Sequence, residues 1–226
     1  CRTAAVELVK SAGAGQPEDG RQIPCISVSK NNLSDYLGRK QIRAERKLSA
    51  KVPGVVTGLA WTRAGGAILF IETKLTPGKG KLLITGQLGD VMKESVQIAL
   101  SLVKSMYPKE CRVFEDHDLH IHVPAGAVPK DGPSAGITLT TALASLVTGK
   151  AVDTDIAMTG EVSLRGGVMP IGGLPEKLMA AQRAGIKRVF IPEDNADDLE
   201  DVADEVKEKL EIIPVKKVTD VLKKVL

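Results

Sequence analysis

The chain has 226 residues, of which 43% are hydrophobic, enough for one substantial domain and a smaller flanking piece. Its 31 basic and 28 acidic residues leave a formal net charge of +3, too small to require a polyanionic partner, so no nucleic acid is expected. Aromatic residues make up only 3%, so no platform for stacking bases is visible either.

The first 44 residues are predicted to form a small unit of their own. The pair Asn31-Asn32 is a plausible cap for a short helix from Leu33, and the stretch 39–51 is basic and poor in apolar residues. A linker and a boundary are therefore expected near residue 45. This divides the chain into domains over 1–44 and 45–226.

The second domain is predicted to open with strands and to continue with alternating strands and helices. Two β-branched, apolar runs, 54–62 and 67–75, flank a glycine-rich turn, which is a hairpin signature. A helix over 90–106 follows, with Asp90 as its cap and Val91 on its apolar stripe. The remaining strands are expected over 81–85, 119–123, 155–158, 188–191 and 212–215, and the remaining helices from Pro133, from Pro175, over 195–210 and from Thr219. This order predicts an α+β fold with a mixed β-sheet and packed helices.

Cysteine usage and hydropathy indicate the compartment. The three cysteines are widely separated and contain no C-x-x-C pair, so neither a zinc site nor a redox motif is indicated. A reducing compartment is expected: the cytoplasm, with the mitochondrial matrix as the alternative. The longest uncharged stretch, 133–149, is rich in Ser, Thr and Ala and suits a buried helix better than a membrane span. No membrane partner is therefore expected.

Ser134 is a candidate nucleophile. It lies in the stretch 132–136, Gly-Pro-Ser-Ala-Gly, which matches G-x-S-x-G, a short pattern that is weak alone. The α/β-hydrolase order also needs a histidine after the serine, and His117, His120 and His122 all precede it. If Ser134 is a nucleophile, its base must be another side chain, and a buried lysine can serve.

Lys177 is the candidate base. At helical spacing its neighbours are Leu174, Ala181 and Ala184, which would remove water from the ammonium group. Lowering a lysine pKa from about 10.4 to the useful range of about 7 to 8 costs roughly 4 kcal/mol, which burial can supply. Spacing alone leaves open the alternative that Lys177 lies on the surface beside alanines.

The residues around Ser134 also allow two interpretations of its role. A serine after Gly132-Pro133 can simply start a helix as a cap, and the pattern alone leaves capping and catalysis equally open. Free N–H groups of a first helical turn can also hold a developing oxyanion. Thr159, at the end of a predicted strand, can orient Lys177 through its hydroxyl, although such threonines are usually structural.

His120 and His122 alternate along one predicted strand and therefore share a face. Two histidines can begin a metal site, but the sequence offers no third ligand nearby. Core or interface histidines are favoured over zinc.

Two stretches together, 129–136 (Pro-Lys-Asp-Gly-Pro-Ser-Ala-Gly) and 172–177 (Gly-Gly-Leu-Pro-Glu-Lys), resemble the signature stretches of Lon protease in its bacterial and mitochondrial A-type form. The 43 positions between Ser134 and Lys177 also fit that family. Further matching stretches cover nearly the whole domain, at 56–61, 78–80, 85–95, 120–124 and 158–166.

The resemblance implies a serine endopeptidase that degrades unfolded or regulatory proteins through an acyl-enzyme intermediate. It implies that Ser134 and Lys177 form a catalytic dyad and that the hydroxyl of Thr159 supports the lysine. The matching motifs add three supporting positions, Gly132, Pro133 and His120.

The resemblance also implies partners for this domain. In the family it is fused behind an AAA+ ATPase and assembles as a hexameric ring, and residues 1–44 resemble the end of the ATPase's helical subdomain. No G-x-x-x-x-G-K-[ST] motif occurs in the chain, so no cofactor is expected here. ATP and Mg²⁺ are implied only for the missing ATPase module.

Asp131 is a candidate regulator, because its carboxylate lies three residues before Ser134. A pair between Asp131 and Lys177 would keep the lysine charged and the unassembled domain latent. Two rival functions also stay open. One is a non-catalytic Lon-like module that acts as a ring-forming scaffold, against which the intact Ser134 and Lys177 argue. The other is an esterase that uses the same dyad, which the motifs do not separate from a peptidase.

Overall fold

A computed structural model describes residues 2–12, 26–38, 47–62, 65–125 and 128–226, which fall into two compact units divided at residues 44 and 45. The first unit contains the helix α1 (Arg2–Ala12) and the short helix α2 (Leu33–Leu37). Part of the expected linker, 39–46, and the first two residues, 63–64, of the hairpin turn expected over 63–66 lie outside the described residues.

The expected N-cap position before α2 is confirmed at Asn32, but the side chain does not cap the helix. The Oδ1 of Asn32 instead accepts the backbone N–H of Ser29 at 2.7 Å. The amide therefore stabilises the turn before the helix, a local alternative that Asn side chains commonly take.

The second unit is built on one large sheet. Its strands are β1 (Val55–Thr62), β2 (Gly65–Pro77), β3 (Leu82–Thr85), β4 (His117–His122), β5 (Ile156–Met158), β8 (Arg188–Pro192) and β9 (Glu211–Val215), in the spatial order β3-β4-β2-β1-β5-β8-β9. β2 is antiparallel to β1 and β4, whereas the other neighbouring pairs are parallel. The mixed sheet predicted from the sequence is thus confirmed.

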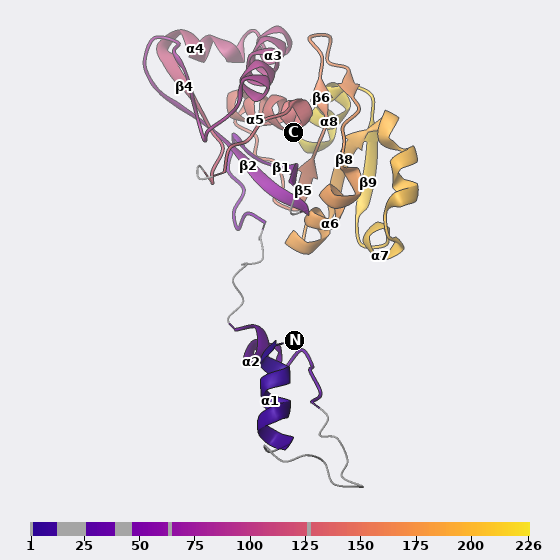
Figure 1. Ribbon diagram of the computed structural model, residues 1–226. Helices are drawn as coiled ribbons and strands as arrows, with labels where there is room; N and C mark the ends of the chain where they lie inside the picture. The colour runs from indigo at the N-terminus through magenta and orange to yellow at the C-terminus, as the bar shows by residue number, and fades with distance from the viewer. Residues whose placement is uncertain (1, 13–25, 39–46, 63–64, 126–127) are drawn as a thin grey trace. The chain divides into compact units, whose positions relative to one another are not determined.

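The alternation along β2 explains why the sheet has a core on each face. Leu69 and Ile71 point into a cluster shared with α3 and α5, and Ile68 and Phe70 point into a second cluster shared with α6. Successive strand residues face opposite sides, so one apolar strand serves both cores. The sheet is covered on both faces, as Figure 1 shows for α5 and α6.

The helices divide between these two cores. The first core takes α3 (Asp90–Met106), α4 (Val113–Asp116), α5 (Gly136–Thr148) and α8 (Val218–Val225), with the 3-10 turns η1 (Glu110–Arg112) and η2 (Pro133–Ala135) nearby. The second core takes α6 (Leu174–Ala184). A small hairpin that the sequence did not predict, β6 (Glu161–Val162) with β7 (Val168–Met169), lies outside the main sheet. No helix among the described residues is long and apolar enough to cross a membrane.

The helix predicted over 90–106 has the expected bounds, but two of its details are wrong. Gly89 is the N-cap residue, so Asp90 is already the first helical residue. Val91 is 43% exposed, because the buried stripe lies one residue further along and begins at Met92. The missing cap comes from Asp131, whose Oδ1 accepts the N–H of Met92 at 3.0 Å.

The single helix predicted over 195–210 is also wrong. This acidic segment forms three short pieces, η3 (Glu193–Asn195), η4 (Asp197–Asp201) and α7 (Asp204–Lys207). One continuous helix would stack like charges at spacings of three and four residues, which destabilises it. The short turns still bury Val202 and Val206 in the second core.

Candidate active site

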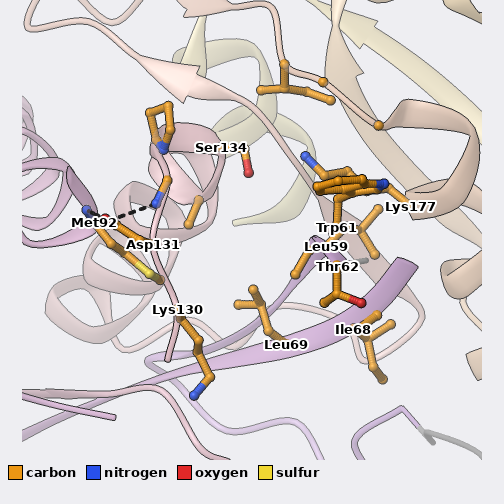
Figure 2. Close-up of a pocket in the computed structure, with 18 of the residues that line it drawn as sticks. Leu59, Trp61, Thr62, Ile68, Leu69, Met92, Lys130, Asp131, Ser134 and Lys177 are labelled. Atoms are coloured by element: carbon orange, nitrogen blue, oxygen red, sulfur yellow. Dashed lines mark hydrogen bonds between the residues drawn. The ribbon is translucent and has the colours of Figure 1, made fainter. Parts of the chain in front are cut away.

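A cavity of about 950 Å³ opens where the two helical layers meet the end of β1. Its walls come from β1 and β2, from the loop before α5 and from the loop before α6. Ser134, Lys177 and Asp131 all line it. Figure 2 shows the hydroxyl of Ser134 and the amino group of Lys177 turned toward one another across this space.

Ser134 is held by its backbone in η2, directly before α5. Its carbonyl accepts the N–H of Gly160 at 2.9 Å and the hydroxyl of Thr159 at 3.4 Å. The turn begins at Gly132, whose φ of 127° is a conformation that residues with a side chain rarely adopt. Pro133 occupies the first positions of the turn, where its missing N–H costs no hydrogen bond.

Lys177 is buried in the first turns of α6 and is only 2% exposed. Leu174, Ala181 and Ala184 are buried with it, as helical spacing predicts. Burial lowers the pKa of Lys177 to about 8, because the charged form loses its water. The alternative of a surface lysine is therefore wrong.

Thr159 joins the lysine to the serine's backbone. Its side chain is fully buried at the end of β5, and its Oγ1 accepts a hydrogen bond from the Lys177 Nζ at 3.2 Å. The same hydroxyl donates to the carbonyl of Ser134. No hydrogen bond joins the Ser134 Oγ to the Lys177 Nζ among the described residues, and such contacts often tighten only when substrate binds.

Gly66 lets the helix that carries Lys177 approach the sheet closely. A Cβ added at Gly66 would lie 1.9 Å from the carbonyl oxygen of Glu176 in α6. Arg183, on the last turn of α6, donates to the carbonyl of Gly66 at 2.9 Å. The start of β2 thus fixes the depth at which α6 packs.

The expected pair between Asp131 and Lys177 is absent from the described ion pairs and hydrogen bonds. Asp131 lies on the far side of the cavity, where its Oδ1 accepts the N–H groups of Met92 and Gly132, as the dashed lines of Figure 2 show. Two N–H groups and the positive end of a helix hold the carboxylate there. The hypothesis of an Asp131–Lys177 latch is therefore not supported.

His120 is not part of the cavity wall. Its Nε2 lies 2.8 Å from the hydroxyl of Thr85, and the Nδ1 of His122 lies 2.7 Å from the same oxygen. The described residues contain no group of three or more His, Cys, Asp or Glu that could hold a metal. The parallel register pairs Leu83 with His120 and Thr85 with His122, and both imidazoles reach the hydroxyl of Thr85 from one face of β4.

The sequence reading missed two residues of the cavity wall. Trp61 lies at the rim against Gly173 and is 56% exposed, and the signal was available, since it is the chain's only tryptophan and ends a predicted strand. Lys130 donates to the carbonyls of Gly86, Ala125 and Val128. Nothing in its sequence neighbourhood distinguishes it from a solvated loop lysine.

Comparison with known proteins agrees with this geometry. The family model of the Lon protease (S16) C-terminal proteolytic domain matches residues 27–226. The Lon protease of Clostridium beijerinckii is 60% identical over 201 residues, which cover 89% of this chain and 25% of that protein. The Lon protease of Methanosarcina barkeri is 54% identical over 201 residues, covering 88% and 25%. That of Azospirillum brasilense is 50% identical over 226 residues, covering 99% and 27%.

The fold and these matches define a protease domain. The chain belongs to the Lon protease (S16) C-terminal proteolytic domain family, as its two signature stretches predict. It spans about a quarter of the length of the relatives named above.

Proposed function

We propose that the chain is a serine endopeptidase in which Ser134 is the nucleophile and Lys177 the general base. The observation that carries this proposal is a buried lysine that faces the serine across a cavity and has a pKa of about 8. At pH 7 about a tenth of such lysines are neutral, against fewer than about one in a thousand at the ordinary pKa. A neutral amine is what proton removal from a serine needs.

The proposed reaction has two balanced halves. Neutral Lys177 takes the proton of the Ser134 hydroxyl while the Oγ attacks the peptide carbonyl, and the resulting ammonium passes that proton to the leaving amine. The C–N bond breaks and an ester on Ser134 remains. Lys177 then deprotonates a water that hydrolyses this ester, which releases the carboxylic acid and returns the proton to Ser134.

The backbone around Ser134 supports the charge that develops in this reaction. The N–H groups of the first turn of η2 and α5 lie at the positive end of a helix dipole, which favours an oxyanion. Thr159 plays a different part, because its hydroxyl holds the Lys177 amine at the cavity wall. No metal or organic cofactor takes part in these steps.

The substrate that we propose is an extended segment of an unfolded or regulatory protein, delivered by an ATPase module of a longer polypeptide assembled as a hexameric ring. ATP and Mg²⁺ belong to that module in this proposal, and the domain acts in a reducing compartment such as the cytoplasm. The proposal rests on family membership and on the open, largely apolar cavity wall.

The proposal is tested with an unstructured fluorogenic peptide and the wild-type chain, Ser134→Ala and Lys177→Met, without ATP. Oligomeric state is measured alongside. Activity lost in both variants, together with an acyl adduct on the wild-type Ser134 in mass spectrometry, is the expected result. A wild type that assembles into a ring and still cleaves no peptide would favour the ring-forming scaffold instead.

The esterase alternative is separated by matched ester and amide substrates with the same acyl group. An endopeptidase hydrolyses the amide in a Ser134-dependent way. Ester hydrolysis with no amide hydrolysis would replace the peptidase by a simpler acyl hydrolase.

A further inference from the structure

Asn195 is a buried polar residue that the proposed chemistry does not use. It is 4% exposed, and its side chain makes three hydrogen bonds. The Oδ1 accepts the N–H of Ile171 at 2.9 Å, and the Nδ2 donates to the carbonyl of Ile171 at 2.8 Å. The Nδ2 also donates to the Asp198 carboxylate at 2.6 Å.

These partners fix the orientation of the amide. A backbone N–H can only donate, so the oxygen of Asn195 must face it. A carbonyl and a carboxylate can only accept here, so the amino group must face both. The side chain therefore pairs with both backbone groups of Ile171, as a neighbouring strand would. A substitution by Asp removes both donated bonds at almost constant shape, but it also adds a negative charge, which by itself raises a lysine pKa.

Ile171 connects this clamp to the active site. It lines the cavity and packs in the second core beside Leu174 and Leu178, which are the buried face of α6. Two residues further on, the carbonyl of Gly173 accepts the N–H of Lys177 at 3.1 Å, the first hydrogen bond of the helix. Ile171 therefore lies three residues before the first residue of α6, in the segment that leads into the helix.

We infer that Asn195 is a positioning residue: by holding both backbone groups of Ile171, it fixes the start of α6 and keeps the Lys177 amine buried against Thr159. This rests on the proposed function only in assigning Lys177 the role of base. The acidic segment around Asn195 is then a support for the cavity wall and not only a solvated face.

Among the residues that the structure describes, no charged group adds to burial in lowering the pKa of Lys177. Lys130 and Asp131 line the same cavity, but both are engaged with backbone groups of their own loops and of α3. On α6 itself, Glu176 precedes the lysine and Arg183 is bound to Gly66. Burial alone lowers the pKa of Lys177, so a looser α6 should raise it.

The test compares the wild type with Asn195→Asp and with Val206→Ala, a control that removes packing from the same core but no hydrogen bond to Ile171. Thermal unfolding measures how much stability each variant loses, so that the two can be compared at similar losses. The pKa of Lys177 is then measured directly by NMR titration of labelled lysine, with Lys177→Met identifying the signal. The kcat and KM for the fluorogenic peptide are measured over the same pH range.

The expected result is a pKa of Lys177 raised by about one unit in Asn195→Asp, with kcat at pH 7 lowered about tenfold and KM little changed. Val206→Ala should keep the wild-type pKa at equal or greater loss of stability. An unchanged pKa in Asn195→Asp would overturn the inference even if activity fell.

A second variant covers the case in which Asn195→Asp does not fold. Asp198→Ala removes one acceptor of the Asn195 amide and leaves the clamp on Ile171 less firmly oriented, so a smaller rise in the pKa of Lys177 is expected. Loss of the Asp198 charge alone would lower that pKa, so this variant also separates positioning from charge, and an unchanged or lowered pKa would overturn the inference. If the wild type assembles into a ring and still shows no Ser134-dependent hydrolysis, the proposed function fails. The NMR titration still decides the role of Asn195.

Discussion

Two lysines line one cavity, and their surroundings are opposite. The amino group of Lys130 donates to three backbone carbonyls, of Gly86 at 3.2 Å, Ala125 at 2.8 Å and Val128 at 3.1 Å. The amino group of Lys177 has one partner among the described residues, the hydroxyl of Thr159 at 3.2 Å. Lys177 is also almost fully buried, whereas Lys130 keeps contact with water.

This difference separates a structural cation from a base. Three carbonyl dipoles stabilise an ammonium group, so Lys130 ties its loop together as a cation, although partial burial lowers its pKa somewhat. A single hydroxyl offers far less, and burial brings the pKa of Lys177 down to about 8. A buried lysine becomes a usable base only where few hydrogen-bond acceptors stabilise its charged form.

The largest difference between the two lysines should appear in activity. Lys177→Met is expected to lower kcat/KM by about 10²–10⁴-fold, the usual contribution of a general base. Lys130→Met, a substitution of the same chemistry in the same cavity, should lower it less than about tenfold, because it loosens a wall without removing the base. Peptide hydrolysis by equal amounts of folded variant measures both, and equal losses would break the distinction.

The two substitutions should also move stability in opposite directions. Lowering the pKa of Lys177 from 10.5 to about 8 costs the folded state about 3 kcal/mol when the lysine is charged in the unfolded chain. Lys177→Met should recover much of this at pH 7. Lys130→Met should instead lose roughly 1–3 kcal/mol, because three carbonyls lose their donor. Denaturant unfolding of both variants measures these changes.

The pH dependence of stability tests whether the gain in Lys177→Met comes from removing the buried charge. Between pH 8 and about 10.4 the unfolded chain holds the Lys177 proton and the folded chain does not, so the stability of the wild type rises with pH in this window. The advantage of Lys177→Met should therefore be complete below pH 8 and shrink as the pH approaches 10. An advantage that is constant with pH would point to better packing of methionine instead.

The pH profile of activity sharpens the same contrast. A base with a pKa of about 8 must be neutral, so kcat/KM should rise about tenfold per pH unit up to pH 8 and then level off. Lys130→Met should keep this midpoint. A profile that is flat from pH 6 to 9 would exclude Lys177 as the base that limits the rate.

Local patterns in the sequence named the residues of one half of this site but left their roles open, and the family resemblance chose among the alternatives. The small apolar residues one turn from Lys177 allowed its burial, the G-x-S-x-G match named Ser134, and Thr159 stood at the end of a predicted strand. These features depend on neighbours within a few residues along the chain, which helical and strand periods describe.

Contacts between distant loops could not be predicted in the same way. Asp131 reaches the N-terminus of α3 across 39 positions, and Asn195 reaches Ile171 across 24. A short polar side chain in a loop has many possible partners, and periodicity does not choose among them. The acidic residues around Asn195 made a solvated helix the simplest reading, and the buried amide at its start was missed.

The smallest expected effect is that of substituting Asp131. It decides whether Asp131 pairs with Lys177 in solution. If Asp131 paired with Lys177 there, the lysine would resemble Lys130, and Asp131→Ala would lower the pKa of Lys177 and raise peptidase activity. The cap on Met92 predicts otherwise: a loss of about 1 kcal/mol of stability with no gain in activity. Asp131→Asn keeps an oxygen for the helix and should lose less than Asp131→Ala. Higher peptidase activity in both variants would restore the latch, because both substitutions remove the charge. A larger loss of stability in Asp131→Ala than in Asp131→Asn, with the midpoint of the pH profile still near 8, identifies the helix cap.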